Sequence, residues 1–293
     1  INNTTNIKLS QVISYAFVAG ATSAIITLDG RSTTFGDKNP IINGITVERL
    51  ATSESNLKSM NAVTLIGNEV SAGNINANGL VTIQNSSNSS INGIIRDVSS
   101  SVSLAKTGSG TLTLSGVNTY TGTTTISAGT LSVATIGNGG VAGNLGQATN
   151  AAANLVLDGG TLQYTGTTAS TNRNFTLTTG STSKIDVSNA GATLTIAGAS
   201  INTTGSLTKE GVGTLELTGT NLHTGTTTVS AGTLKVNIGV LSNSTISVSE
   251  GAFCIGTACA TNIYLVIGSD QSTIYGEEYA LAYYLSTSPT DYT

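Results

Sequence analysis

The sequence predicts an all-β protein: a right-handed parallel β-solenoid (a β-helix) with atypical end segments. Aliphatic residues alternate with Thr or Ser in short runs, and many of the 35 glycines stand where these runs end. The stretch 104–133 also returns at 207–236 without a gap. Near-identical copies are typical of stacked coils, because one coil cannot bury its own apolar face. An antiparallel sandwich would alternate as well, but it would not require the copies.

The composition fits a strand-rich protein that works outside the cell. Only 9% of residues are charged, against about a quarter in an average protein. The 38% of hydrophobic residues argue against a disordered linker. A net charge of −4 without basic runs predicts no nucleic-acid partner, and no apolar run is long enough for membrane insertion. The start at Ile1 and the few charges favour a secreted, extracellular or bacterial cell-surface protein.

Three segments follow one another along the chain. Residues 1–75 are predicted to form an atypical N-terminal β segment, with short strand-like runs separated by turn residues and no copy of the repeat. Residues 76–250 hold the solenoid repeats. Residues 251–293 form a C-terminal segment that contains both cysteines and six of the nine tyrosines. We expect the two end segments either to cap the solenoid or to join it to another copy.

Each strand of the repeat is predicted to have one apolar face. In GTLTLSG, Leu112 and Leu114 point one way and the threonines point the other, because successive strand residues alternate. Leu131 and Val133 follow the same pattern in GTLSV. We therefore expect these four side chains in the interior, with glycines at corners that need positive φ or close backbone approach.

The end segments are candidates for self-assembly. An open solenoid end presents unpaired backbone groups that can accept a further strand. The segment 9–20 could complete a neighbouring copy, and the Tyr-rich end could supply aromatic contacts. The residues assigned to this role are Val12, Ile13, Tyr15, Phe17, Tyr279, Tyr283 and Tyr284.

The two cysteines stand close together in FCIGTAC, where Gly256 permits a tight turn. A disulfide between Cys254 and Cys259 that closes this short hairpin is the preferred interpretation. Two free buried thiols are the alternative. A metal site is not expected, because the single histidine, His223, lies far away in the sequence.

The sequence offers no recognisable set of catalytic residues. The carboxylates are scattered, and Glu277 and Glu278 are neighbours that would point to opposite faces of a strand. His223 stands where the first copy has a tyrosine, which indicates packing or solvent contact rather than catalysis. Lys106 and Lys209 recur in the two copies, and we expect them to be edge or solvent charges. The prediction is that the protein is no enzyme and needs no cofactor.

The repeat resembles the autotransporter-associated β-strand repeat. That family's pattern is close to L-x-K-x-G-x-G-x-L-x-L-x-G-x-N-x-Y-x-G-x-T-x-[VI]-x-x-G-x-L. It stands at 104–131, and at 207–234 with His223 in place of the tyrosine. The resemblance implies a secreted, surface-exposed β-helical passenger that serves as an adhesin, an aggregation factor or a stalk. Autotransporters also have a translocator barrel, which we do not expect within this chain.

Three functions are compatible with these observations. The first is a secreted structural solenoid that assembles end to end with copies of itself into an extracellular fibre, sheath or surface layer. The alternative is a monomeric passenger fragment that acts as an adhesin or a stalk, with a cell surface or glycans as its partner. The third is an enzyme acting on polysaccharide, which would require carboxylates clustered on one face.

Overall fold

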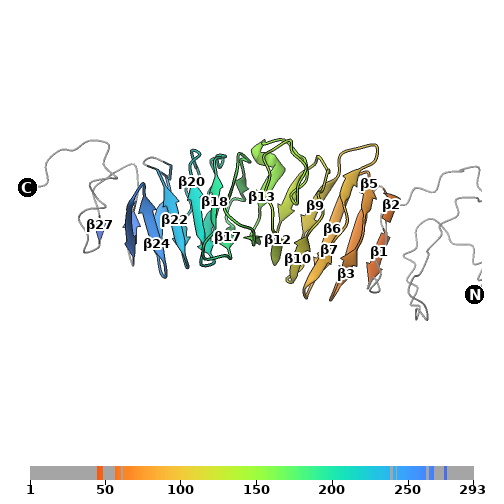
Figure 1. Ribbon diagram of the computed structural model, residues 1–293, viewed down its shortest axis with the longest axis horizontal. Helices are drawn as coiled ribbons and strands as arrows, with labels where there is room; N and C mark the ends of the chain where they lie inside the picture. The colour runs from red at the N-terminus through yellow and green to blue at the C-terminus, as the bar shows by residue number, and fades with distance from the viewer. Residues whose placement is uncertain are drawn as a thin grey trace, which may run out of the picture.

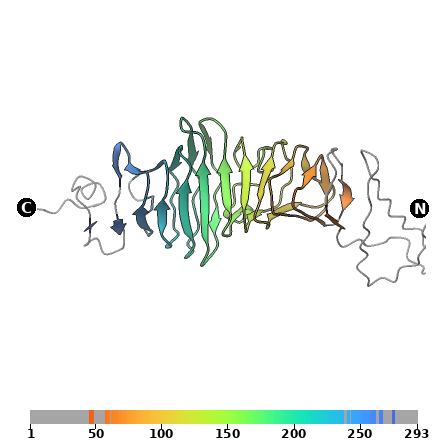
Figure 2. The same cartoon turned by 90° about the horizontal axis from the view of Figure 1, so that it is seen from below.

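The computed structural model describes residues 45–48, 57–60, 62–237, 240–241, 243–261, 264–266 and 274–275. These residues form a long stack of short strands that lie across the long axis of the molecule (Figures 1 and 2). The stack has about 10 turns. The all-β parallel solenoid predicted from the sequence is confirmed. The predicted assembly residues Val12, Ile13, Tyr15, Phe17, Tyr279, Tyr283 and Tyr284 lie outside the described residues.

Four sheets form the sides of the stack, and each is named here by its place in the coil. Sheet I contains β1 (Ile45–Glu48), β3 (Val63–Gly67), β6 (Leu80–Asn85), β9 (Ser103–Lys106), β11 (Thr124–Ile126), β13 (Leu155–Leu157) and β16 (Thr176–Leu177). Sheet II contains β4 (Ser71–Ala72), β7 (Ser89–Ile91), β10 (Thr111–Leu114), β12 (Thr130–Val133), β14 (Thr161–Tyr164), β17 (Thr182–Val187), β19 (Ser206–Glu210), β21 (Thr227–Val229), β23 (Thr245–Val248), β26 (Tyr264–Val266) and β27 (Ile274–Tyr275).

The third side of the coil is divided between two sheets. Sheet III contains β15 (Ala169–Thr171), β18 (Thr193–Ile196), β20 (Thr214–Leu217), β22 (Thr233–Val236), β24 (Ala252–Ile255) and β25 (Ala258–Thr261), whereas sheet IV contains β2 (Leu57–Met60), β5 (Ile75–Ala77) and β8 (Ile95–Asp97). The chain visits sheets I and II and then the third side, as β6, β7 and β8 do. One short 3-10 helix, η1 (Ala152–Asn154), precedes β13. Among the described residues, no helix is long and apolar enough to cross a membrane.

The core is a set of aliphatic ladders that run along the stack. Leu112 pairs with Leu131 and Leu114 with Val133 in the parallel register of β10 and β12, and all four side chains are at most 1% exposed. The inward orientation predicted for these four residues is therefore confirmed. Because each coil buries its aliphatic side chains against the next, the stability of the stack depends on contacts between neighbouring coils.

Parallel pairing continues across residue 75, where the sequence predicts a change of segment. Strand β1 pairs with β3, and β3 pairs with β6, both in parallel register. The sequence-based boundaries at residues 75 and 250 stay predictions.

The parallel stacking gives way to antiparallel pairing at the C-terminal end of the described stack. Strand β24 is followed by β25, which pairs with it antiparallel, and β26 pairs antiparallel with both β23 and β27. All other pairs of named strands in the described residues are parallel. On two of the three sides, the last parallel strand is therefore followed by a strand that runs antiparallel to it.

The two copies of the repeat occupy different sides of the solenoid. The first copy begins with β9 in sheet I and continues with β10 in sheet II, whereas the second begins with β19 in sheet II and continues with β20 in sheet III. The separation of 103 residues between Leu104 and Leu207 thus contains whole coils plus one additional side. Two isolated bridges lie on this additional side. They join Phe175, which directly precedes β16, to Ser200, and Ser200 to Asn221.

Candidate functional site

The repeated lysines are buried in the interior, which corrects the expectation that they are edge or solvent charges. Lys106 and Lys209 are both 0% exposed. The Nζ atom of Lys106 donates hydrogen bonds to the carbonyl oxygens of Gly108 and, at 3.2 Å, Ala128. The alternation of the strand explains their position, because each lysine stands two residues after an inward leucine.

The second lysine makes the same connection in the second copy. Lys209 Nζ donates to the carbonyl oxygens of Glu210 at 2.6 Å, Gly211 at 2.7 Å and Ala231 at 3.2 Å. In both copies the ammonium group joins a corner of its own coil to the corresponding corner of the next. Burial lowers the pKa of each lysine to about 8, so both ammonium groups remain mostly protonated at neutral pH.

Replacing Lys209 with Met is expected to lower the free energy of unfolding by about 2 kcal/mol, because three carbonyl groups lose a charged donor in a buried corner. Lys235→Met is the matched control: Lys235 pairs with Glu216 at 2.9 Å and its side chain is 40% exposed. Removing such a surface ion pair costs less than about 1 kcal/mol. Urea unfolding followed by circular dichroism measures both changes, and equal losses would contradict the structural role of Lys209.

The tyrosine of the first copy and the histidine of the second occupy one equivalent interior position. Tyr120 is 0% exposed, and its hydroxyl group lies 2.6 Å from Thr124 Oγ1. His223 is also 0% exposed, and its Nε2 atom lies 2.9 Å from Oγ1 of Thr227, the counterpart of Thr124. His223 therefore packs in the core, within hydrogen-bond reach of hydroxyl groups.

Asparagine and glycine of the repeat also serve the stacking. Asn118 Oδ1 accepts from the backbone N–H of Ile95 at 2.8 Å, and its Nδ2 donates to the carbonyl of Asn144 at 2.8 Å. At Gly116, a Cβ atom would lie 2.0 Å from the carbonyl oxygen of Gly93 in the coil before. Glycine is required there because the two backbones approach too closely for any side chain.

Arg173 is an interior residue that no sequence motif singles out. It is 3% exposed, and its guanidinium group donates to the carbonyl oxygens of Gly137 at 3.0 Å, Ala148 at 3.3 Å and Gly146 at 2.8 Å. These bonds hold the long Gly-rich excursion between β12 and β13 against the stack. Burial lowers the pKa of this arginine from its usual value.

The outer faces of the sheets carry mainly short polar side chains. One continuous row on sheet II consists of Thr111, Thr130, Thr161, Lys184, Thr208, Thr228 and Ser247. Most of these side chains are half-buried by their neighbours in the row. An ion pair of 2.7 Å between Lys184 and Glu210 adds charge to this face. These outward rows, together with the corners, are what the described part of the solenoid offers to a partner.

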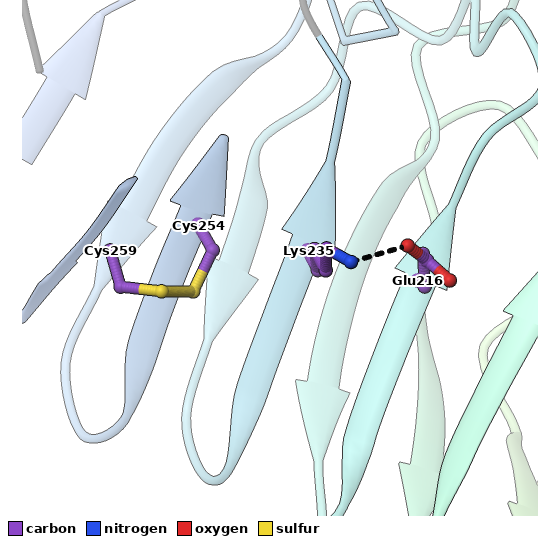
Figure 3. The surroundings of a disulfide bond; sticks show 4 residues. All are labelled: Glu216, Lys235, Cys254 and Cys259. Atoms are coloured by element: carbon purple, nitrogen blue, oxygen red, sulfur yellow. Dashed lines mark ion pairs between the residues drawn. A yellow bond between two sulfur atoms is a disulfide. The ribbon is translucent and has the colours of Figure 1, made fainter. Parts of the chain in front are cut away.

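The two cysteines form a disulfide across the β24–β25 hairpin. Cys254 pairs directly with Cys259 in the antiparallel register, and their Cα atoms are 3.9 Å apart. The row continues through Lys235 and Glu216 on β22 and β20 (Figure 3). The disulfide therefore attaches the reversed strand β25 to the last parallel strand of sheet III.

Few side chains that could act as catalysts or metal ligands lie close together in the described part of the chain. Within the described residues, no three His, Cys, Asp or Glu side chains lie close enough together to hold a metal ion. Glu277 and Glu278 lie outside the described residues. The buried lysines, Asn118, Tyr120 and His223 make hydrogen bonds to the backbone or to hydroxyl groups, which fits a structural role, although Oδ1 of Asn221 has no partner among the residues described.

The chain is similar to the adhesin BmaC autotransporter of Brucella suis biovar 1 (strain 1330), with 52% identity over 127 residues. The matched region is 43% of this chain but only 4% of that relative, so the chain spans a small part of the adhesin's length. No solved structure matches the chain. The passenger-associated-transport-repeat family model matches residues 104–133 and 207–236, the same two stretches in which Lys, Gly, Asn and Tyr or His form the interior contacts. The chain therefore carries two copies of the passenger-associated transport repeat found in autotransporters.

Proposed function

We propose that the chain is a passenger segment of an autotransporter adhesin, displayed at the bacterial surface, in which the solenoid serves as a stalk. The similarity to the passenger of an adhesin supports this function and a secreted or surface location. The proposal contains no catalytic step and no cofactor. Its partner is the surface or glycan that the complete adhesin contacts.

The observation that carries the proposal is that the characteristic side chains of the repeat point into the core. Its lysine, asparagine and aromatic or histidine positions are all buried, and its glycine corner allows adjacent coils to approach closely. A motif whose characteristic side chains face the core can be repeated without adding a binding site. Repetition of this unit lengthens a rod, which is what a stalk requires.

Two measurements test the stalk. An antibody against residues 104–236 should label intact cells of the producing bacterium as strongly as permeabilised ones; label seen only after permeabilisation would contradict the surface location. The purified, fluorescently labelled protein should show no saturable binding to host cells or to a glycan array. Saturable binding that persists on dilution of the protein would replace the stalk by an adhesive role for the segment itself.

End-to-end assembly into a fibre, the first function predicted from the sequence, gains no support from the comparisons. The reversed strands β25 and β26 also weigh against the C-terminal end as a joint, because a further parallel coil would need the edges of β23 and β24 that they cover. Negative-stain electron microscopy over a range of concentrations separates the two functions. Short single rods fit the stalk, and filaments with a repeat of one subunit fit the fibre.

A further inference from the structure

Hydrogen bonds through hydroxyl groups link His223 to the coil before and the coil after its own. Its Nδ1 atom lies 3.0 Å from Ser200 Oγ in the coil before, and its Nε2 atom lies 2.9 Å from Thr227 Oγ1 in its own coil. Thr227 Oγ1 lies 2.8 Å from Ser244 Oγ in the coil after. Ser200, His223, Thr227 and Ser244 are each at most 1% exposed. The histidine thus lies at the centre of a buried polar network.

The hydrogen-bond partners at both ends of the network fix its proton positions. Ser244 Oγ lies 2.5 Å from the carbonyl oxygen of Gly225, to which it must donate, so it accepts from Thr227. Thr227 Oγ1 in turn accepts from the Nε2–H group of His223. Nδ1 is then left as an acceptor for the hydroxyl group of Ser200, whose oxygen accepts from the backbone N–H of Leu222 at 3.1 Å. All donors have acceptors only if the imidazole is neutral.

A proton added to Nδ1 would break this arrangement. The new N–H group would face the hydroxyl hydrogen of Ser200, which would have to turn away from its acceptor. The elements packed around the histidine supply no carboxylate to compensate. Of their charged groups, Lys209 on β19 faces inward, while Lys184, Asp186 and Glu210 lie on the outer face of sheet II and Glu216 and Lys235 on that of sheet III.

We propose that His223 makes the coils of the second repeat acid-sensitive, so that protonation of its imidazole loosens the stack around β19–β24 while the first repeat stays closed. The first repeat is the built-in contrast, because Tyr120 fills the equivalent position with a group that carries no charge in acid. This device would let mild acid act on one region of the rod and leave its neighbour intact. It does not depend on the stalk function proposed above.

The sign of the pH dependence follows from burial. Burial lowers the pKa of His223 from 6.5 to about 4, whereas the unfolded chain keeps the ordinary value. Between these pH values the unfolded state binds more protons than the folded state, so stability falls as the pH decreases from about 6.5 towards 4. Burial raises the pKa of Tyr120 to about 12, so the first repeat contributes no such change in this range.

Hydrogen exchange followed by mass spectrometry tests the proposal on the full chain, with rates corrected for their intrinsic dependence on pH. From pH 7.5 to pH 4.5, protection within residues 206–236 should fall on the order of 50-fold more than protection within 104–133, as one proton on a group with these pKa values predicts. In His223→Tyr, which restores the side chain of the first repeat, this difference should disappear. Glu210 and Glu216 lie only in the second repeat, and acid weakens their ion pairs as well, so the comparison of the parent with His223→Tyr is the one that isolates the histidine.

Two outcomes would overturn the proposal. One is a His223→Tyr protein that loses protection in residues 206–236 as strongly as the parent. The other is a parent protein whose two repeats lose protection equally in acid. If a tyrosine does not fit among Ser200 and Thr227, His223→Gln provides the second variant, since its amide can contact Thr227 but does not titrate. The same loss of the acid response is expected for it, and an acid response equal to that of the parent would contradict the proposal.

Discussion

Replacing Leu112 with Asp is expected to lower the free energy of unfolding by on the order of 5 kcal/mol, which combines the loss of a buried leucine with the burial of an unpaired carboxylate. Leu112 is 0% exposed and stacks between Ser89 of the coil before and Leu131 of the coil after. No basic side chain stands beside it in this ladder. The carboxylate must therefore either become protonated or separate the coils.

Thr113→Asp is the matched control for this prediction. Thr113 is the next residue of β10, points outward and lies in register with Ser90 and Ser132. Its replacement keeps the charge and the strand but leaves the core intact, so the expected cost is about 1 kcal/mol or less. Urea unfolding followed by circular dichroism compares the two. A Leu112→Asp protein that unfolds at the same urea concentration as Thr113→Asp would show that Leu112 does not face the core.

Replacing Gly198 with Ala is expected to destabilise the protein by about 3 kcal/mol through overpacking. A Cβ atom at this position would lie 1.9 Å from the carbonyl oxygen and 2.2 Å from the carbonyl carbon of Arg173 in the coil before. These are backbone atoms, which cannot turn aside as a flexible side chain does. The coils must separate locally, and the hydrogen bonds that place the Arg173 guanidinium are disturbed with them.

The control for this substitution is Gly191→Ala in the preceding loop. A Cβ atom at Gly191 meets no atom within 4 Å, and its backbone does not have the positive φ that disfavours alanine. Its effect on the melting temperature should be small or slightly favourable. Thermal unfolding of the two variants by circular dichroism distinguishes them. If Gly198→Ala melts with Gly191→Ala, the close approach of the two backbones is not what makes glycine necessary.

The alternation of strand residues made much of the fold predictable. Leu112 and Leu131 could be placed in the core because residues two apart share a face. The same rule could have placed Lys106 and Arg173 there, since Lys106 follows Leu104 by two residues and Arg173 precedes Phe175 by two. For Lys106, the general expectation that charges face solvent overrode this alternation, and Arg173 was given no position. The carbonyl groups exposed at a glycine corner are the physical reason why a buried ammonium group is tolerated.

Other features depend on distances along the stack that a local pattern does not contain. The hairpin that leads into β25 was predicted from Cys254, Gly256 and Cys259, whereas the antiparallel pairing of β26 with β23 joins segments that no local pattern connects. The polar network of His223 depends on Ser200 and Ser244, which come from different coils. One replacement of tyrosine by histidine was visible in the sequence, but its hydroxyl partners were not.

The placement of the two repeats on different sides has a consequence for display. Ser109 and Val212 are equivalent corner residues of the two copies, yet Ser109 lies between sheets I and II, whereas Val212, which is 60% exposed, lies between sheets II and III. The two corners therefore project from the rod in different directions. A flat target, such as a membrane or a wall, can touch only one of them at a time. Simultaneous contact through both copies would require a partner that wraps around the rod, or two separate partner molecules.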